Sequence, residues 1–275
     1  MPEPNRIDAY SPPEIAARVE AAGVAKANLP VLQTLTLGTL AGAFISFGSL
    51  FFMLVTTDSG LGLGIERLVG GVAFSLGLIL VVVAGAELFT GNNLIVIAWA
   101  DRKIGSLSLL RNWGLVYAAN FVGAAATAVL VDLSGVLDLS GGAIGAKAVA
   151  IAEAKASLSF SEAFFRGILC NALVCLAIWL AMAARDVTGK ILAIIFPIAA
   201  FVAIGFEHSV ANMFFFPLGM IASPDAAAAG LTVGAFIENL VPVTLGNIVG
   251  GSVFVALIYY VIYVRGSGPG AAGEA

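Results

Sequence analysis

The chain has 275 residues, of which 60% are hydrophobic and 11% are charged. Soluble domains carry roughly a quarter charged residues, so this composition excludes an ordinary soluble domain and indicates an integral membrane protein. The formal net charge is −4 and contains no basic tract, which argues against nucleic acid as a partner.

Residues 1–30 are polar and lack the short apolar core of a signal peptide. Within them, the segment SPPEIAARVEAAGVAKANL has Ser11 as a candidate N-cap and prolines in the first turn. Ile15, Val19 and Ala22 then recur at helical spacing. We predict an N-terminal amphipathic helix that lies on the cytoplasmic face of a membrane.

Residues 31–264 are predicted to form one transmembrane channel domain. Six apolar runs can each supply the roughly 20 residues that a helix needs to cross about 30 Å of hydrocarbon. Two of the runs would be roughly 48–50 Å long as straight helices, so we expect both to break. The runs are residues 31–55, 68–100, 113–131, 164–184, 191–222 and 241–264, and the two overlong ones are the second and the fifth.

The lysines and arginines assign the two sides of this arrangement. Nine lie on one side and four on the other, and the more positive side is normally cytoplasmic. We therefore expect both termini in the cytoplasm. Residues 265–275 are rich in glycine and are predicted to form a disordered C-terminal tail. The nine are Arg6, Arg18, Lys26, Arg102, Lys103, Arg111, Arg185, Lys190 and Arg265, and the four are Arg67, Lys147, Lys155 and Arg166.

An internal repeat relates the two overlong runs. GAELFTGNN from Gly85 aligns with GFEHSVANM from Gly205, sharing glycine, glutamate and asparagine at the first, third and eighth positions, at an offset of 120 residues. NFVGA from Asn120 aligns with NIVGG from Asn247 at an offset of 127. Because each copy holds three spans, the second copy must be inverted, as in transporters whose site lies at the bilayer midplane.

Glu87 and Glu207 lie at equivalent points of the two expected breaks. Non-helical backbone at membrane depth is tolerated only where protein groups or a water-lined cavity satisfy it. The two carboxylates could accept bonds from freed N–H groups, or from Asn92 and Asn212. We prefer this structural role to proton carriage because both copies share it, with proton carriage as the alternative.

His208 is the only histidine of the chain, and Leu88 takes its place in the first copy. An ionisable side chain in a membrane span is a candidate functional residue, so we predict a role in transport. The alternative is a neutral histidine bonded to a neighbour such as Asn171. Thr90, matched by Val210, could bind an anion or cap a helix. A single histidine without a cysteine cluster predicts no metal or haem cofactor.

The paired motifs GAELFTGN and GFEHSVANMFFFPLG resemble the formate/nitrite transporter family, and the likeness runs from Lys26 to the sixth span. The resemblance implies a homopentamer in the lipid bilayer of a prokaryotic cytoplasmic membrane, with a separate pore in each protomer. It implies an all-α, aquaporin-like fold of two inverted three-helix repeats, with the second and fifth helices broken. Asn92 and Asn93, followed by LIVIAW, favour the formate-transporting members.

The resemblance also assigns roles within the pore. His208 would be the central polar residue, Asn171 its hydrogen-bond partner, and Lys155 the lysine that draws anions into the outer vestibule. Apolar side chains would form the constrictions, although such residues can also simply pack. The implied pathway consists of His208, Thr90, Asn171, Lys155 and Glu207, and the implied constrictions of Phe74, Leu78, Leu88, Phe89 and Phe201.

The implied substrate is formate, a one-carbon carboxylate. Its charge would cost several kcal/mol in an apolar constriction without a partner, whereas the neutral acid avoids most of that cost. We therefore expect Lys155 to concentrate the anion and His208 to relay a proton to it before passage. Formate and a proton are thus the expected partners.

Other functions are weighed against this one. Nitrite, hydrosulfide and bicarbonate are alternative substrates for the same fold. A water or polyol channel of the aquaporin type is less favoured, because neither break carries an Asn-Pro-Ala motif. A membrane enzyme that uses Glu207 and His208 as acid and base is also less favoured, since no nucleophile, metal cluster or nucleotide-binding loop accompanies them.

Overall fold

The computed structural model describes residues 9–265, and all regular structure in that range is helical. Apart from Arg265, the tail predicted for residues 265–275 lies outside the described residues. The elements in chain order are α1 (Pro12–Ala27), α2 (Val31–Thr56), α3 (Leu63–Leu80), η1 (Val81–Gly85), η2 (Gly91–Ile95), α4 (Val96–Ala100), α5 (Ser106–Leu133), η3 (Val136–Asp138), α6 (Leu139–Ala156), α7 (Phe160–Ala183), α8 (Val187–Ile204), α9 (Ser209–Ala222), α10 (Val233–Ile248), η4 (Val249–Leu257) and η5 (Tyr260–Val264).

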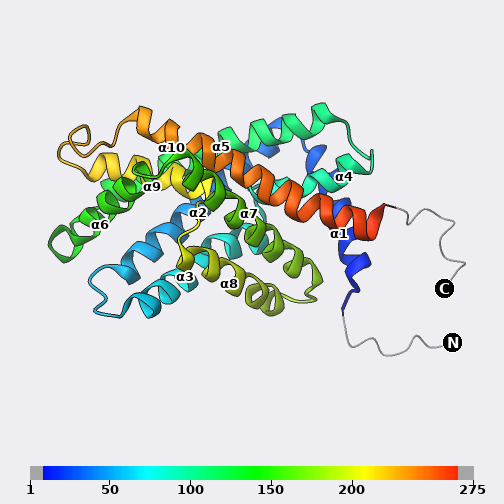
Figure 1. Cartoon of the computed structure of the whole chain (residues 1–275), viewed down its shortest axis with the longest axis horizontal. Helices are drawn as coiled ribbons and strands as arrows, with labels where there is room; N and C mark the ends of the chain where they lie inside the picture. The colour runs from blue at the N-terminus through cyan, green and yellow to red at the C-terminus, as the bar shows by residue number, and fades with distance from the viewer. Residues whose placement is uncertain (1–8, 266–275) are drawn as a thin grey trace, which may run out of the picture.

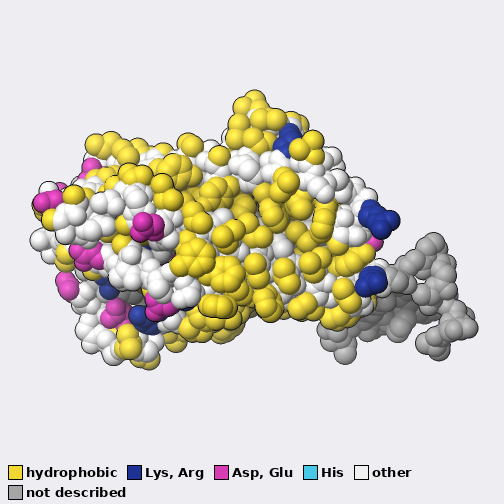
Figure 2. All heavy atoms as spheres, turned by 45° about the horizontal axis from the view of Figure 1, so that its top comes forward, with side chains coloured by type: hydrophobic (Ala, Val, Ile, Leu, Met, Phe, Trp, Pro, Cys, Tyr) yellow, Lys and Arg dark blue, Asp and Glu magenta, His cyan; other side chains and the backbone are white. Residues whose placement is uncertain are grey.

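Within residues 9–265, six helical segments are long and apolar enough to cross a membrane, which confirms the expected number of spans. The helices pack side by side in Figure 1, with α1 and α4 at one end of the molecule and α6 at the other. In Figure 2, hydrophobic side chains cover the middle of the face in view, and charged side chains gather toward the two ends. The six segments are Val31–Thr56, Leu63–Gly85, Ser106–Leu133, Phe160–Ala183, Val187–Ile204 and Val233–Val264.

Five spans begin earlier than the apolar runs indicated, and the third and sixth differ most. The third begins at Ser106 instead of residue 113, because Arg111 lies inside the helix and its Nη2 donates to the carbonyl of Leu29 (3.2 Å). The sixth begins at Val233 instead of residue 241, because the polar Asn239 lies inside α10 and bonds to protein groups. A polar residue with a protein partner does not end a membrane helix.

The overlong apolar runs each contain more than one helical element. Between Gly85 and Gly91 the residues Ala86–Thr90 belong to no helix, and between Ile204 and Ser209 the chain passes through a short non-helical stretch. Gly85 and Gly205 stand at the start of these stretches with φ of 86° and 85°. Only glycine adopts this left-handed conformation without strain, so both glycines allow a helix to stop there.

Small residues bring the spans into close contact. A Cβ on Gly123 would lie 2.0 Å from the carbonyl oxygen of Thr39, where α5 crosses α2. A Cβ on Gly250 would lie 2.1 Å from the carbonyl oxygen of Ile168, where η4 crosses α7. Close backbone approach at small residues is a common basis of helix association in membranes. Gly123 and Gly250 are 127 residues apart, the same offset as between Asn120 and Asn247.

The helix α1 packs over η2 and α4. The carboxylate of Glu14 accepts bonds from the N–H (2.6 Å) and Oγ (2.7 Å) of Ser11 at its start. Ile15 and Val19 are buried against the hydrophobic cluster that η2 and α4 supply. Glu20, on the same face, forms an ion pair with Lys103 in the segment after α4. The N-terminal helix is thus attached to the body of the protein by both apolar and charged contacts.

Candidate functional site: two cavities and a central histidine

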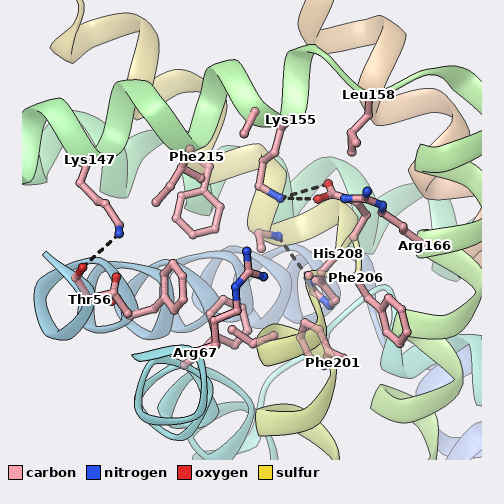
Figure 3. A pocket seen from close by; sticks show the side chains of 18 of the residues that line it. Thr56, Arg67, Lys147, Lys155, Leu158, Arg166, Phe201, Phe206, His208 and Phe215 are labelled. Atoms are coloured by element: carbon pink, nitrogen blue, oxygen red, sulfur yellow. Dashed lines mark hydrogen bonds and ion pairs between the residues drawn. The ribbon is translucent and has the colours of Figure 1, made fainter. Parts of the chain in front are cut away.

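A cavity of about 280 Å³ opens beside α6, and we call it the Lys155 cavity. His208 and Glu207 line it, together with the rings of Phe74 and Phe201. Figure 3 shows the side chains of Lys147, Lys155, Arg67 and Arg166 around this space. The Lys155 cavity therefore brings basic side chains to the same space as the only histidine.

A second cavity, of about 430 Å³, opens beside α1, and we call it the Lys26 cavity. Lys26, Glu87, Leu88, Asn92 and Lys190 are among its lining residues. Because α1 and α6 lie at opposite ends of the molecule in Figure 1, the two cavities lie toward opposite ends of the molecule.

His208 stands between α8 and α9 and caps α9. Its Nδ1 accepts a hydrogen bond from the N–H of Ala211 (3.1 Å). A ring nitrogen that accepts a bond carries no proton, so the neutral imidazole has its proton on Nε2. Nε2 lies 2.9 Å from Oγ1 of Thr90 and donates to it. Both ring nitrogens of this buried side chain have partners, which fixes the orientation of the ring.

We expected Asn171 to be the hydrogen-bond partner of His208, and the structure corrects this expectation. Asn171 does bind in this region, but its Nδ2 donates to the carbonyl of Thr90 (3.2 Å), to Oδ1 of Asn93 (2.7 Å) and to the carbonyl of Asn247 (2.7 Å). The side-chain partner of His208 is Thr90. Asn171 therefore holds the backbone of Thr90, and it reaches the histidine only through that residue.

Glu207 lies at the centre of a buried polar cluster beside the Lys155 cavity. Its carboxylate accepts two bonds from Nζ of Lys155 (2.9 and 3.0 Å) and one from Nδ2 of Asn212 (2.7 Å). Nδ2 of Asn212 also donates to Oδ1 of Asn239 (2.7 Å), whose Nδ2 donates to the carbonyl of Lys155 (2.9 Å). Lys155 is therefore paired with a carboxylate and carries no isolated charge.

Glu87 lies at the centre of a matching cluster beside the Lys26 cavity. Its carboxylate accepts bonds from Nζ of Lys26 (2.5 Å) and Nδ2 of Asn92 (2.7 Å). Nδ2 of Asn92 also donates to Oδ1 of Asn112 (2.9 Å), whose Nδ2 donates to the carbonyl of Lys26 (3.1 Å). The two clusters contain the same residue types in the same order of bonds.

Asparagine side chains, and not the two glutamates, hold the free backbone groups of the non-helical stretches. Oδ1 of Asn120 accepts from the N–H of Phe89 (2.9 Å), and its Nδ2 donates to the carbonyl of Glu87 (2.9 Å). Oδ1 of Asn247 accepts from the N–H of Ser209 (2.9 Å), and its Nδ2 donates to the carbonyl of Glu207 (3.0 Å). The bonds that we expected from Asn92 and Asn212 to the carboxylates are present; the expected bonds from backbone N–H groups to them are not among those of the described residues.

The five apolar residues implied as constrictions are all buried. The ring of Phe201 stacks on His208 (centroids 6.0 Å apart) and meets the edge of Phe74 (5.7 Å). Phe89 instead packs on Tyr117 (4.8 Å) and Trp113 (6.1 Å) of α5. Phe201 therefore lies next to the histidine and Phe74 next to Phe201, whereas Phe89 is held in packing against α5. The five are Phe74, Leu78, Leu88, Phe89 and Phe201.

Lys26, Asn112 and Asn239 belong to the site but were not predicted as site residues. Lys26 lies 129 residues before Lys155, and Asn112 lies 127 residues before Asn239, close to the offset of 127 between Asn120 and Asn247. Extending the alignment outward from the motifs would have found both pairs. No group of three His, Cys, Asp or Glu side chains able to hold a metal occurs among residues 9–265.

Residues 9–265 contain six helical segments long and apolar enough to span a membrane, and two cavities toward opposite ends of the molecule, one of which is lined by the buried His208. This combination is typical of a helical membrane transport protein. The sequence model of one family, described as formate/nitrite transporter, matches residues 13–261. The chain belongs to the formate/nitrite transporter family, as its motifs indicated. The members of this family are channels and transporters, so the alternative of a membrane enzyme is rejected.

Known proteins resemble the chain over nearly its whole length. It is 44% identical to the formate channel FocA of Escherichia coli strain K12, covering 96% of this chain and 98% of FocA. It is 42% identical to a probable formate transporter of Methanothermobacter thermautotrophicus, covering 93% and 97%. A solved structure described as a pentameric formate channel with formate bound is 40% identical, with a TM-score of 0.77, covering 85% of this chain and 97% of that one. A second, described as an FNT family ion channel, is 32% identical with a TM-score of 0.81, covering 90% and 98%.

Proposed function

We propose that this protein is a homopentameric membrane channel or transporter for formate. The observation that carries the proposal is the similarity, over nearly full length, to proteins described as formate channels and to a pentameric structure with formate bound. The family's description also includes nitrite, so nitrite is the first alternative substrate, ahead of hydrosulfide and bicarbonate. Each protomer would have its own path, which joins the Lys155 cavity to the Lys26 cavity past His208 and Thr90.

The path would lie between two inverted three-helix repeats, with α3 and α4 as one broken helix and α8 and α9 as the other. Two sets of bonds support this reading, because each recurs in both halves: the bonds of the Lys26 and Lys155 clusters, and the bonds of Asn120 and Asn247. The positive-inside rule then orients the protein. The Lys26 cavity and both termini would face the cytoplasm, and the Lys155 cavity would face the outside.

Passage would require that the anion become neutral next to the apolar side chains of Phe74, Phe201 and Leu78. An unpaired charge in such surroundings costs several kcal/mol, whereas the neutral acid does not carry that cost. His208 is the titratable group beside these side chains, and its Nε2–H is the proton that points to Thr90. We infer that formate takes its proton through this histidine.

The geometry of His208 sets a condition for such a relay. If Nε2 gives up its proton while Nδ1 accepts from Ala211, the ring is left as an imidazolate, which is not accessible near neutral pH. Nδ1 must therefore take up a proton, and the bond from the Ala211 N–H must open. A relay at His208 thus includes a small movement at the start of α9.

The proposal is tested with full-length protein in liposomes. Initial rates of formate and nitrite uptake are measured over a range of external pH, for the wild-type protein and for His208→Phe, with empty liposomes as the control. We expect formate uptake above the control that increases as the pH falls, and loss of this dependence in His208→Phe, which still assembles as a pentamer by light scattering. Uptake of nitrite without formate uptake would reject the substrate; wild-type pH dependence in His208→Phe would reject the relay.

A further inference from the structure

The charges around the Lys155 cavity do not balance. Each of its two carboxylates is paired with a lysine: Glu207 with Lys155 (2.9 Å), and Glu66 with Lys147 (3.4 Å). Neither of its two arginines is in an ion pair with any other described residue. The cavity's surplus of positive charge therefore resides on the arginines. The charged lining residues are Arg67, Lys147, Lys155, Arg166, Glu66 and Glu207.

Arg67, near the start of α3, is held beside the chain that leads to His208. Its Nη1 donates to the carbonyl of Ala203 (3.3 Å). Gly205 follows with φ of 85°, and a Cβ there would lie only 3.1 Å from this nitrogen. The glycine thus leaves room for the guanidinium group against the backbone, and the remaining N–H donors of Arg67 bond to no group of residues 9–265 and stay available to a ligand.

Arg166 approaches the same space from α7. Its carbonyl accepts a bond from the N–H of Glu207 (3.3 Å), which fixes its backbone to the stretch that carries His208. Figure 3 shows its side chain entering the cavity next to the ion pair made by Lys155. Because that ion pair is close to neutral as a unit, Arg166 supplies the positive charge on this side of the cavity. Its electrostatic neighbour Glu162, one turn earlier on α7, is exposed and does not line the cavity.

We propose that Arg67 and Arg166 form the subsite that binds the carboxylate of the incoming substrate in the Lys155 cavity. A guanidinium group presents parallel N–H donors that match the two oxygens of a carboxylate, which an ammonium group does not. Arg67 and Arg166 line the same cavity as His208, so an anion held by them lies in the space from which the histidine is reached. In this proposal Lys155 holds the carboxylate of Glu207 in place and does not itself capture the anion.

This inference rests on the proposed function, since the ligand it names is the substrate. The first test compares Arg67→Gln, Arg166→Gln and Arg166→Lys with Arg102→Gln, which removes an exposed arginine outside both cavities. The formate concentration that gives half-maximal uptake should rise about three- to tenfold in each cavity Gln variant, with the maximal rate unchanged. Arg166→Lys, which keeps the charge without the fork, should lie between Arg166→Gln and wild type.

The effect should shrink when an impermeant salt is added to about 1 M, because the Debye length is then about 3 Å. Half-maximal concentrations equal to wild type in both cavity Gln variants, or no larger shift than in Arg102→Gln, would overturn the proposal. A fall in maximal rate without a change in half-maximal concentration would overturn it as well, because the arginines would then act in a step that follows binding of the anion.

A second measurement does not depend on transport. The solubilised wild-type protein is treated with an arginine-specific dicarbonyl reagent, and modification at each arginine is read by mass spectrometry. Formate, at ionic strength matched with chloride, should slow modification of Arg67 and Arg166 but not of Arg102. Protection in a protein that transports no formate would support the subsite and reject the proposed function. Transport without protection would reject the subsite alone. The absence of both transport and protection would reject the subsite and the proposed function together.

Discussion

Asn247→Ala removes three hydrogen bonds at the stretch before α9. Oδ1 of Asn247 accepts from the N–H of Ser209 (2.9 Å), and Nδ2 donates to the carbonyls of Gly167 (2.8 Å) and Glu207 (3.0 Å). The side chain is fully buried. An unpaired buried polar group costs about 1–3 kcal/mol. Because the carbonyl of Gly167 lies within α7, where carbonyls have backbone donors, we expect a total of about 3 kcal/mol or somewhat more.

Asn120→Ala is the matched variant, because Asn120 makes the equivalent bonds to Phe89, Gly38 and Glu87 (2.8–2.9 Å). Asn28→Ala is the control, since Asn28 is exposed and its one side-chain bond goes to the carbonyl of Val24. For a protomer of this size, a loss of about 3 kcal/mol lowers Tm by roughly 6–12 °C.

The assay is thermal unfolding of the purified oligomer, followed by intrinsic fluorescence and by size-exclusion chromatography after heating. Both buried-asparagine variants should melt well below Asn28→Ala. If both melt with that control, the asparagines do not hold the non-helical stretches. If only one is destabilised, the two halves of the protein are not equivalent in the way that the paired bonds suggest.

Three further predictions concern single contacts. Thr90→Val leaves the Nε2–H of His208 without its acceptor and should lower stability by about 1–3 kcal/mol, while Thr90→Ser should melt like wild type and keep its formate flux. Glu207→Gln leaves Lys155 unpaired in a site where that side chain is 13% exposed, so Tm and flux should both fall, and Glu87→Gln should behave alike through Lys26. Burial raises the pKa of Glu20 by more than the contact with Lys103 lowers it, so the neutral form of Glu20 is favoured in the fold although the charged form has a partner. The attachment of α1 should then be strongest below the pKa of an unfolded glutamate, and it should weaken as the pH rises through the raised pKa. Hydrogen exchange of α1 amides across this pH range should show that trend in wild type and lose it in Glu20→Gln.

Much of the fold could be predicted because the bilayer limits the possible structures. Apolar runs of sufficient length identify the spans, and the count of six was correct. The ends of the spans were less predictable. Arg111 and Asn239 read as polar borders in the sequence, yet both lie inside helices because other segments supply their partners. Hydropathy contains no information about such partners.

The candidate site was predicted as a set of residues but not as a set of contacts. His208 stood out because it has no counterpart in the first copy of the repeat, whereas its partner Thr90 is 118 residues away and could not be chosen over Asn171 from spacing. Lys155 was expected to act as a free charge, and its pairing with Glu207, 52 residues away, depends on how α6 packs against the start of α9. The bonds between distant residues decide which charges are neutralised.

Whether formate crosses together with a proton is decided by following both species in one experiment. Liposomes with the wild-type protein contain a pH-sensitive dye and are exposed to an inward formate gradient at equal internal and external pH, with empty liposomes as the control. If formate crosses with the proton that His208 relays, the interior acidifies faster than in the control, proton entry matches formate entry, and His208→Phe loses both. Formate entry that leaves the internal pH unchanged and requires a compensating ion current would contradict this account, because the anion would then cross with its charge.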